Sequence, residues 1–407
     1  MILHVLWQVI LVGAIDTATV TIGAGNFNRQ NCVFYRSVTS WPVPRNGFGV
    51  TFHPKAGVKT QRPLLLGIWM NMRERPVVAV LLCAILLLAT GRSADRANPP
   101  KLGKVTVAEG PAVLWREPSD IESRDLFYGP GGKSHEPHGD LTFLSEDTTG
   151  SSPKFEAVDE EGLHWKVKLG IEAKPETAAS RLVWAAGYFA NEDYFVREIR
   201  VRNLPHLHRG GHYVSAGGLV HDVRLKRHSP NEKKLGIWQW SNNPFHGARE
   251  WNGLRALMAL LNNWDLKDVN NAIYQTKAAQ PEQHYLVSDL GASLGTTYLN
   301  RPLKGDLRSY EESKWINTVT ADHVDFGVPG QPPVGYIFAV PLLVQRMELV
   351  WIGRGVPRAD VAWLGHLLAR LSSNQIRDAF RASGYSSDEV ERFSRVVERR
   401  IDEIKRL

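Results

Sequence analysis

Cysteine is nearly absent from this chain of 407 residues, which contains only Cys32 and Cys83. Both precede residue 95, where the part with the composition of a folded body begins. A disulfide framework and a cysteine-based zinc site are therefore excluded from that body. A dense basic stripe is missing too, because the cations behind the net charge of +7 are interleaved with acids. That distribution argues against a nucleic-acid partner.

A 15-residue apolar run is present at residues 76–90. Arg73 and Arg75 precede the run, and the small residues Ala89 and Gly91 stand at its exit. A charged flank, a short apolar stretch and a small-residue exit are typical of a secretory signal peptide. The run is shorter than the about 20 residues that a transmembrane helix needs. We therefore predict an exported protein, located in the periplasm, in the cell envelope or outside the cell.

This prediction places the start of translation at Met70 or Met72. Residues 1–71 would then be a mis-annotated or disordered extension, and residues 72–94 a signal peptide or membrane anchor. The alternative is a genuine N-terminal segment followed by an internal anchor, with membrane association through 76–90 if that run is not cleaved. N-terminal sequencing of the mature protein decides between them, since a first residue upstream of Met70 would contradict our prediction.

The whole chain is 43% hydrophobic and 22% charged, and its length and composition suit two lobes with cores of their own. Residues 95–140 are a predicted leader and loop. Residues 141–235 form a predicted β-rich N-lobe, with alternating strands and one helix with apolar residues at helical spacing. The predicted strands are 141–144, 154–158, 164–169 and 195–201, and the predicted helix is 175–188.

A mainly helical C-lobe is predicted for residues 236–407, so the fold class is α+β. A strong amphipathic helix at 248–263 leads into two short strands that form a hairpin. The stretch 300–331 has a loop-rich composition. The predicted strands are 272–274 and 284–287, and the later helices are 361–371, 376–380 and 387–407.

The chemistry-bearing residues lie around that hairpin. Asp265 follows the apolar helix, and a carboxylate fixed there can accept or orient a hydroxyl proton. Asn270 and Asp289, at the two ends of the hairpin, offer oxygen ligands suited to Mg²⁺. Lys267 is assigned to the nucleotide, and Gly291 allows a sharp turn after the second acid. Each of these residues is common singly at helix ends and turns, but the combination predicts phosphoryl transfer.

A cation for the phosphates is predicted on the strand 164–169. Strand alternation puts Lys166 and Lys168 on one face, and Lys168 is nearer the start of the following helix. Glu176 on that helix can pair with Lys168 and hold its position. The alternative is that Lys168 and Glu176 form an ordinary exposed pair on an amphipathic strand and helix.

The run Asp265-Leu266-Lys267, with Asn270 three residues on, resembles the catalytic loop of protein kinases, and Asp289-Leu290-Gly291 resembles their metal-binding Asp-Phe-Gly. The wider run from Asn262 to Tyr274 is similar to the Asn-Trp-Asp and Asn-Asn-Tyr motifs of the spore-coat CotH-type kinases, and the context also resembles the HipA-type kinases. The resemblance covers residues 141–297 and is moderately specific only around 262–291.

This resemblance implies a two-lobed, protein-kinase-like fold that uses ATP and Mg²⁺. It makes Asp265 the catalytic acid or base, Asn270 and Asp289 the metal ligands, and Lys168 with Glu176 the nucleotide-positioning pair. The chain departs from the pattern in lacking a Gly-x-Gly-x-x-Gly loop and in carrying Trp264 before the catalytic acid. The acidic pair of CotH-type proteins is also reduced to one acid.

The function expected from these residues is Mg²⁺- and ATP-dependent transfer of phosphate to protein hydroxyl groups, on a protein substrate that the sequence does not identify. Two alternatives remain at this point. One is a catalytically inactive kinase-like domain that serves as an exported binding or structural protein, because an exported protein meets little ATP. The other is nucleotidyl transfer on the same fold.

Overall fold

The structure is a computed structural model in which residues 109–298, 301–327, 344 and 347–407 are described. Contacts between residues group Asn98–Leu407 into one compact unit. The predicted N-terminal extension and the apolar run at 76–90 lie outside the described residues. Within the described ranges, no helix is both long and apolar enough to cross a membrane.

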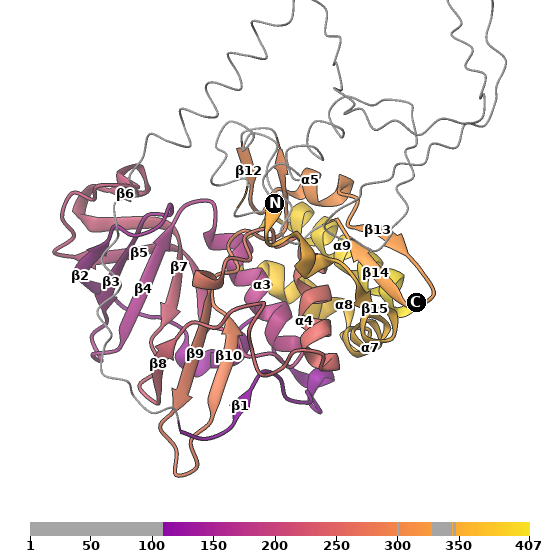
Figure 1. Cartoon of the computed structure of the whole chain (residues 1–407). Helices are drawn as coiled ribbons and strands as arrows, with labels where there is room; N and C mark the ends of the chain where they lie inside the picture. Colours follow the sequence, from indigo (N-terminus) through magenta and orange to yellow (C-terminus); the bar gives the residue numbers. More distant parts are fainter. Residues whose placement is uncertain (1–108, 299–300, 328–343, 345–346) are drawn as a thin grey trace, which may run out of the picture. The chain divides into compact units, whose positions relative to one another are not determined.

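The N-lobe is built around a closed β-barrel, seen at the left of Figure 1. Neighbouring strands pair antiparallel in the order β2, β3, β4, β7, β5. A short parallel pairing of Leu141 with Val201 then joins β5 back to β2 and closes the ring. The strands are β2 (Leu141–Asp147), β3 (Lys154–Val158), β4 (His164–Leu169), β5 (Asp193–Arg202) and β7 (Leu219–Arg227), with the short β6 (Val214–Ser215) paired to β7.

Strand alternation sorts the barrel side chains into two environments. Trp165, Val167 and Leu169 of β4 are buried in the apolar core of the barrel. Lys166 and Lys168 occupy the intervening positions and therefore face outward. On the neighbouring strand, Arg224 stands directly opposite Lys168. The outer face of the barrel thus carries cations toward the elements that pack on it.

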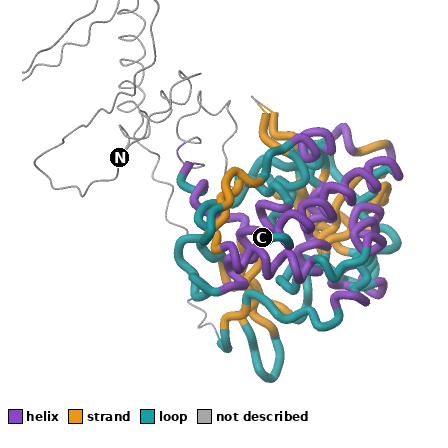
Figure 2. The backbone as a smooth tube through the Cα atoms, turned by 90° about the vertical axis from the view of Figure 1, so that its right-hand side faces the viewer, coloured by secondary structure: helices purple, strands orange, loops and turns teal. Residues whose placement is uncertain are grey.

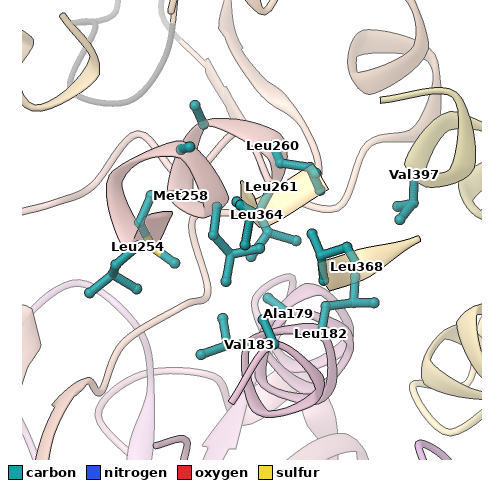
Figure 3. Packing of buried hydrophobic residues seen from close by; sticks show 14 of the residues in the cluster. Ala179, Leu182, Val183, Leu254, Met258, Leu260, Leu261, Leu364, Leu368 and Val397 are labelled. Carbon is teal, nitrogen blue, oxygen red and sulfur yellow. The ribbon is translucent and has the colours of Figure 1, made fainter. Parts of the chain in front are cut away.

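Helix α3 (Ala173–Ala185) connects the barrel to the rest of the molecule. It packs against β5 and β7 of the barrel and against α8 of the C-lobe. Its apolar face, with Ala179, Leu182 and Val183, belongs to the core of the C-lobe. Figure 3 shows these side chains facing leucines of α4 and α7. Because this face of α3 is buried in the C-lobe, the start of the helix can place polar groups at the junction of the two lobes.

The C-lobe is mainly helical, as Figure 2 shows in purple. Its long C-terminal helix, α9, packs against α7 and α8. The Ser372 and Ser386 side chains cap α8 and α9 in reciprocal capping boxes, which fixes where these helices begin. The helices are α4 (Arg249–Leu260), α5 (Leu307–Glu312), α7 (Arg358–Leu368), α8 (Ser373–Arg381) and α9 (Ser387–Lys405).

Small sheets complete the C-lobe. One has the strand order β1, β10, β9, β8, and its hairpin β9–β10 carries the predicted motif residues at its ends. Two others, β11–β12 and β13–β14–β15, lie further along the chain. Their bounds are β1 (Ala112–Val113), β8 (Glu232–Gly236), β9 (Asn271–Thr276), β10 (Gln283–Val287), β11 (Thr296–Tyr298), β12 (Arg301–Leu303), β13 (Ile316–Val319), β14 (His323–Phe326) and β15 (Val356–Pro357).

The α+β, two-lobed architecture predicted from the sequence is confirmed, and β3 and β4 have the predicted bounds. The helix predicted at 175–188 spans Ala173–Ala185, and three further local predictions were wrong. The first strand continues to Asp147 because it pairs with β3 along its length. The helix predicted to reach residue 263 ends at Leu260, because Asn262 adopts a positive φ of 53° that breaks the helix. The stretch 300–331, expected to be loop-rich, contains β12, α5, β13 and β14.

Candidate active site

Lys168 lies at the centre of a buried cluster of charges between the two lobes. Its ammonium nitrogen is 2.7 Å from a carboxylate oxygen of Glu176, 3.0 Å from one of Glu172 and 3.2 Å from one of Asp289. Burial opposes the charge on Lys168, but the surrounding carboxylates outweigh it and raise the pKa of Lys168. Lys168 therefore remains an ammonium ion at neutral pH.

Helix α3 and its N-cap residue supply the two glutamates of this cluster. Glu172 and Glu176 are one helical turn apart, so both side chains project toward Lys168. The second oxygen of Glu176 accepts a hydrogen bond from Arg224 of β7 at 3.0 Å, and Arg224 also lies 3.5 Å from Asp193. Burial raises the pKa of Glu176, and Arg224 and Lys168 act against that rise. Glu176 is thus held between two cations that it orients.

Lys168 and Glu176 are 4% and 1% exposed. The sequence-based alternative, in which they form an exposed surface pair, is therefore wrong. Strand alternation alone does not distinguish an outward side chain covered by a helix from one covered by water. The covering comes from α3 and from the turn that carries Asp289, which is contributed by the other lobe.

The loop after α4 is held in place by buried polar contacts. The Asn262 side chain donates to the carbonyl oxygen of Gly295 at 2.9 Å. Arg400 of α9 donates to the carbonyl oxygen of Leu260 at 2.7 Å and to the Asn262 side-chain oxygen at 2.8 Å. The Arg400 side chain is fully buried. The start of the loop that carries Asp265 is therefore pinned to the C-terminal helix.

Asp265 and Asn270 lie in this loop and are linked to each other. The Asn270 side-chain nitrogen donates to the backbone oxygen of Asp265 at 2.6 Å. Because the nitrogen is engaged in this way, the amide oxygen of Asn270 is the atom that can serve as a metal ligand. The Asp265 carboxylate is 20% exposed and lies 3.4 Å from the Lys267 ammonium.

Asp289 is brought to this loop by the β9–β10 hairpin. In the hairpin, Asn271 pairs with Val287, so the residues that flank the two strands meet. The backbone oxygen of Asn270 accepts hydrogen bonds from the amide of Ser288 at 2.8 Å and from that of Asp289 at 3.0 Å. The two predicted metal ligands are therefore neighbours through the backbone, although the whole hairpin separates them in the sequence.

The Asp289 carboxylate is a strong candidate ligand because it is charged and accessible. Burial of its inner part opposes ionisation, but the Lys168 ammonium and the amide of Gly291 outweigh this and lower the pKa of Asp289 well below its usual range. Its side chain is 41% exposed. A carboxylate oxygen and an amide oxygen are both oxygen ligands of the kind that Mg²⁺ binds.

The predicted residues thus come together in two ways. Lys168, Glu176 and Asp289 meet through their side chains, whereas Asp265 and Asn270 join them through the backbone of the loop and hairpin. The sequence analysis missed Glu172 and Lys304, which form a further ion pair at the cluster. The spacing of four residues from Lys168 could have drawn attention to Glu172. No local signal marked Lys304.

The strand order of the barrel, the lysine–glutamate pair of β4 and α3, and the Asp265, Asn270 and Asp289 positions decide the fold type. The chain has a protein-kinase-like fold. No protein-family model matches it, and no curated protein matches its sequence.

Solved structures of atypical protein kinases are similar to this kinase-like chain. The proinflammatory kinase CtkA of Helicobacter pylori is 12% identical, with a TM-score of 0.36 over 66% of this chain and 95% of that one. The Rio2 kinase of Chaetomium thermophilum, in a complex with ADP, Mg²⁺ and phosphoaspartate, is 10% identical, with a TM-score of 0.28 over 64% and 72%. A Golgi casein kinase is 9% identical, with a TM-score of 0.25 over 64% and 72%. At such low similarity, the roles of individual residues rest on the geometry above.

Proposed function

We propose that this chain is a Mg²⁺- and ATP-dependent phosphotransferase that phosphorylates hydroxyl groups of proteins. One observation carries the proposal: the buried Lys168–Glu176 pair contacts Asp289, whose backbone is hydrogen-bonded to Asn270. Phosphoryl transfer requires a cation on the phosphates, metal ligands and a group beside the acceptor, held in fixed positions. This arrangement supplies all three at the junction of the lobes.

The residues have separate roles in this proposal. Lys168 binds the phosphates of ATP, and Glu176 holds the ammonium group in position. Asp289 and the amide oxygen of Asn270 would hold Mg²⁺, which would neutralise charge on the phosphates when it is bound. Lys267 lies beside Asp265 and adds a cation on the side of the phosphate that is transferred.

Asp265 acts on the acceptor. In the transfer step, the acceptor oxygen forms a bond to the terminal phosphorus while the bond from that phosphorus to the bridging oxygen of ADP breaks. The hydroxyl proton passes to the Asp265 carboxylate, which lies in a loop fixed at both ends. Asp265 therefore orients the hydroxyl and takes up its proton, and its removal should affect transfer more than nucleotide binding.

The direct test is calorimetry of ATP binding to the full chain with and without Mg²⁺, followed by an assay of phosphate transfer from labelled ATP to a generic protein substrate. Mg²⁺-dependent binding and transfer are the expected results. Absence of binding at millimolar ATP would contradict the proposal. Binding without transfer would instead favour the inactive kinase-like domain. Transfer of a nucleotidyl group, seen with label on the α-phosphate, would favour nucleotidyl transfer.

A further inference from the structure

Lys304 forms an ion pair with Glu172 at the edge of the charge cluster. Lys304 follows the hairpin of β11 and β12, which returns the chain to the segment after Asp289. There the amide of Gly305 donates a hydrogen bond to the backbone oxygen of Ser293 at 3.0 Å. The Lys304 and Glu172 side chains are 10% and 8% exposed. The pair is therefore more enclosed than an ordinary surface ion pair.

One carboxylate joins two cations at this point. Glu172 uses one oxygen for Lys168, at 3.0 Å, and its other oxygen for Lys304. Burial opposes the charge of Glu172, but Lys168 and Lys304 lower its pKa, so it stays ionised. The two ammonium groups are thus held on opposite sides of a single carboxylate.

The surroundings place Lys304 beside the predicted reaction centre. A Cβ atom on Gly291 would lie 2.8–3.0 Å from atoms of the Glu172 side chain, so Glu172 packs directly on the turn after Asp289. The Lys304 ammonium is 5.7 Å from the centre of the Trp264 ring, and Trp264 immediately precedes Asp265. Lys304 therefore lies between the Asp289 turn, the start of α3 and the loop of the proposed base.

We propose that Lys304 is a further phosphate-binding cation, besides Lys168 and Lys267, which contacts the terminal phosphate of the nucleotide, and that Glu172 is its counter-ion before the nucleotide binds. This inference rests on the proposed function. Lys168 projects from the barrel and reaches the phosphates from the N-lobe side. Lys304 reaches them from the side of Asp265, where the acceptor hydroxyl and hence the terminal phosphate must lie.

Charge balance supports an exchange of partners at Glu172. In the described part of the cluster, Lys168, Arg224 and Lys304 are matched by the carboxylates of Glu172, Glu176, Asp193 and Asp289. A divalent cation held by Asp289 turns this net negative cluster positive, which favours an incoming anion. Phosphate oxygens can then replace the Glu172 carboxylate as partners of both ammonium groups. Lys304 remains protonated and stabilises the negative charge on the transferred group.

The test compares ATP with ADP, because only ATP has the terminal phosphate. Lys304→Met in the full chain should weaken Mg²⁺-ATP binding by about 10- to 100-fold, the value of a charge-assisted hydrogen bond, and leave Mg²⁺-ADP binding nearly unchanged. Lys304→Arg should keep most of the discrimination between ATP and ADP. The exposed Lys314→Met serves as the matched control and should change neither affinity. Equal loss of both affinities, or no loss, would overturn the inference.

A second variant tests Glu172 and remains informative if Lys304→Met does not fold. Glu172→Gln removes the competing charge and should raise the affinity for Mg²⁺-ATP, whereas a lower affinity would show that Glu172 positions the site and would overturn its role as counter-ion. The failure of the inference can be told from that of the proposed function. If the unaltered chain binds ATP and ADP with Mg²⁺ but the ratio does not respond to Lys304, only the inference fails. If the unaltered chain binds neither ATP nor ADP, both the inference and the proposed function fail.

Discussion

The backbone amide of Asp289 donates a hydrogen bond to the backbone oxygen of Asn270 at 3.0 Å. This contact joins the two ends of the β9–β10 hairpin, so the residues proposed to hold Mg²⁺ are placed by main-chain geometry. Their relative positions therefore do not depend on the metal.

Asp289→Asn should abolish Mg²⁺-dependent ATP binding, because it removes the only anionic ligand of the proposed metal pair. Lys168 keeps its contacts with Glu176 and Glu172, so the fold should persist. Calorimetry measures binding, and thermal unfolding reports the fold. The matched control is Asp402→Asn at an exposed position of α9, which should leave binding intact. Unchanged Mg²⁺ dependence in Asp289→Asn would remove it from the metal site.

Asp265→Asn should spare ATP binding and lower the rate of transfer by about 10²- to 10⁴-fold, the usual contribution of a general base. The amide keeps the size of the carboxylate but takes up no proton. Binding by calorimetry and transfer from labelled ATP separate the two effects, with Asp402→Asn again as the control. Full transfer activity in the variant would show that Asp265 is not the base.

Gly291→Ala should destabilise the turn after Asp289. Its Cβ would lie 2.8 Å from an oxygen of Glu172 and 2.9 Å from the Glu172 Cβ, so the side chain has to move. Overpacking of this kind costs about 1–3 kcal/mol in the free energy of unfolding, and ATP affinity should fall with it. Gly211→Ala, where no atom lies within 4 Å of the added Cβ, is the control for urea denaturation. Equal stability of the two variants would contradict the close packing of Glu172 on Gly291.

Lys226→Met should stabilise the protein at neutral pH. Burial, with a contribution from Arg224, lowers the pKa of Lys226 from 10.5 to about 8. Below pH 8 the lysine is charged in both the folded and the unfolded state, so its desolvation destabilises the fold in full. Between about pH 8 and 10.5 the folded state loses the proton first, and stability due to this group rises with pH.

The gain from Lys226→Met should thus be about 1–3 kcal/mol at pH 7 and should shrink toward pH 10. Urea denaturation at several pH values measures it, with Lys314→Met as an exposed control. A gain that is the same at all pH values would show that Lys226 is not titrated differently in the folded state.

Arg400→Met should cost about 1–3 kcal/mol in the free energy of unfolding, because it leaves the buried side-chain oxygen of Asn262 without its donor. The backbone oxygen of Leu260 loses one of its two donors and keeps the hydroxyl of Tyr310. Since these atoms begin the Asp265 loop, transfer activity should fall as well. The neighbouring Arg399, which is 54% exposed, provides the control Arg399→Met. A similar small loss in both variants would mean that Arg400 does not hold the loop.

Much of the N-lobe could be predicted from the sequence because strand alternation is a local property. The bounds of β3 and β4 and the outward direction of Lys168 follow from period-two patterns alone. The closure of the barrel could not be predicted in this way. It depends on the pairing of Leu141 with Val201, which brings together residues that share no local signal.

In the candidate site, too, local patterns could be predicted from the sequence and long-range contacts could not. Its motif residues Asp265, Asn270 and Asp289 could be named from the sequence, because the hairpin between them is short and its pairing brings its ends together. By contrast, the sequence left open whether Lys168 and Glu176 form a positioned pair at the site or an exposed pair on the surface. That choice depends on α3 and the Asp289 turn, which arrive from different parts of the chain.

The sequence by itself therefore determined which residues are proposed to carry the chemistry and on which face of each strand they lie, since alternation and hairpin pairing act over a few residues. Only the tertiary structure decided which charges share one site. Lys304 meets Glu172, and Arg400 meets Asn262, across 132 and 138 positions of the chain. Such contacts form because the packing of the lobes removes these groups from water, and a buried charge then requires a partner wherever the fold supplies one.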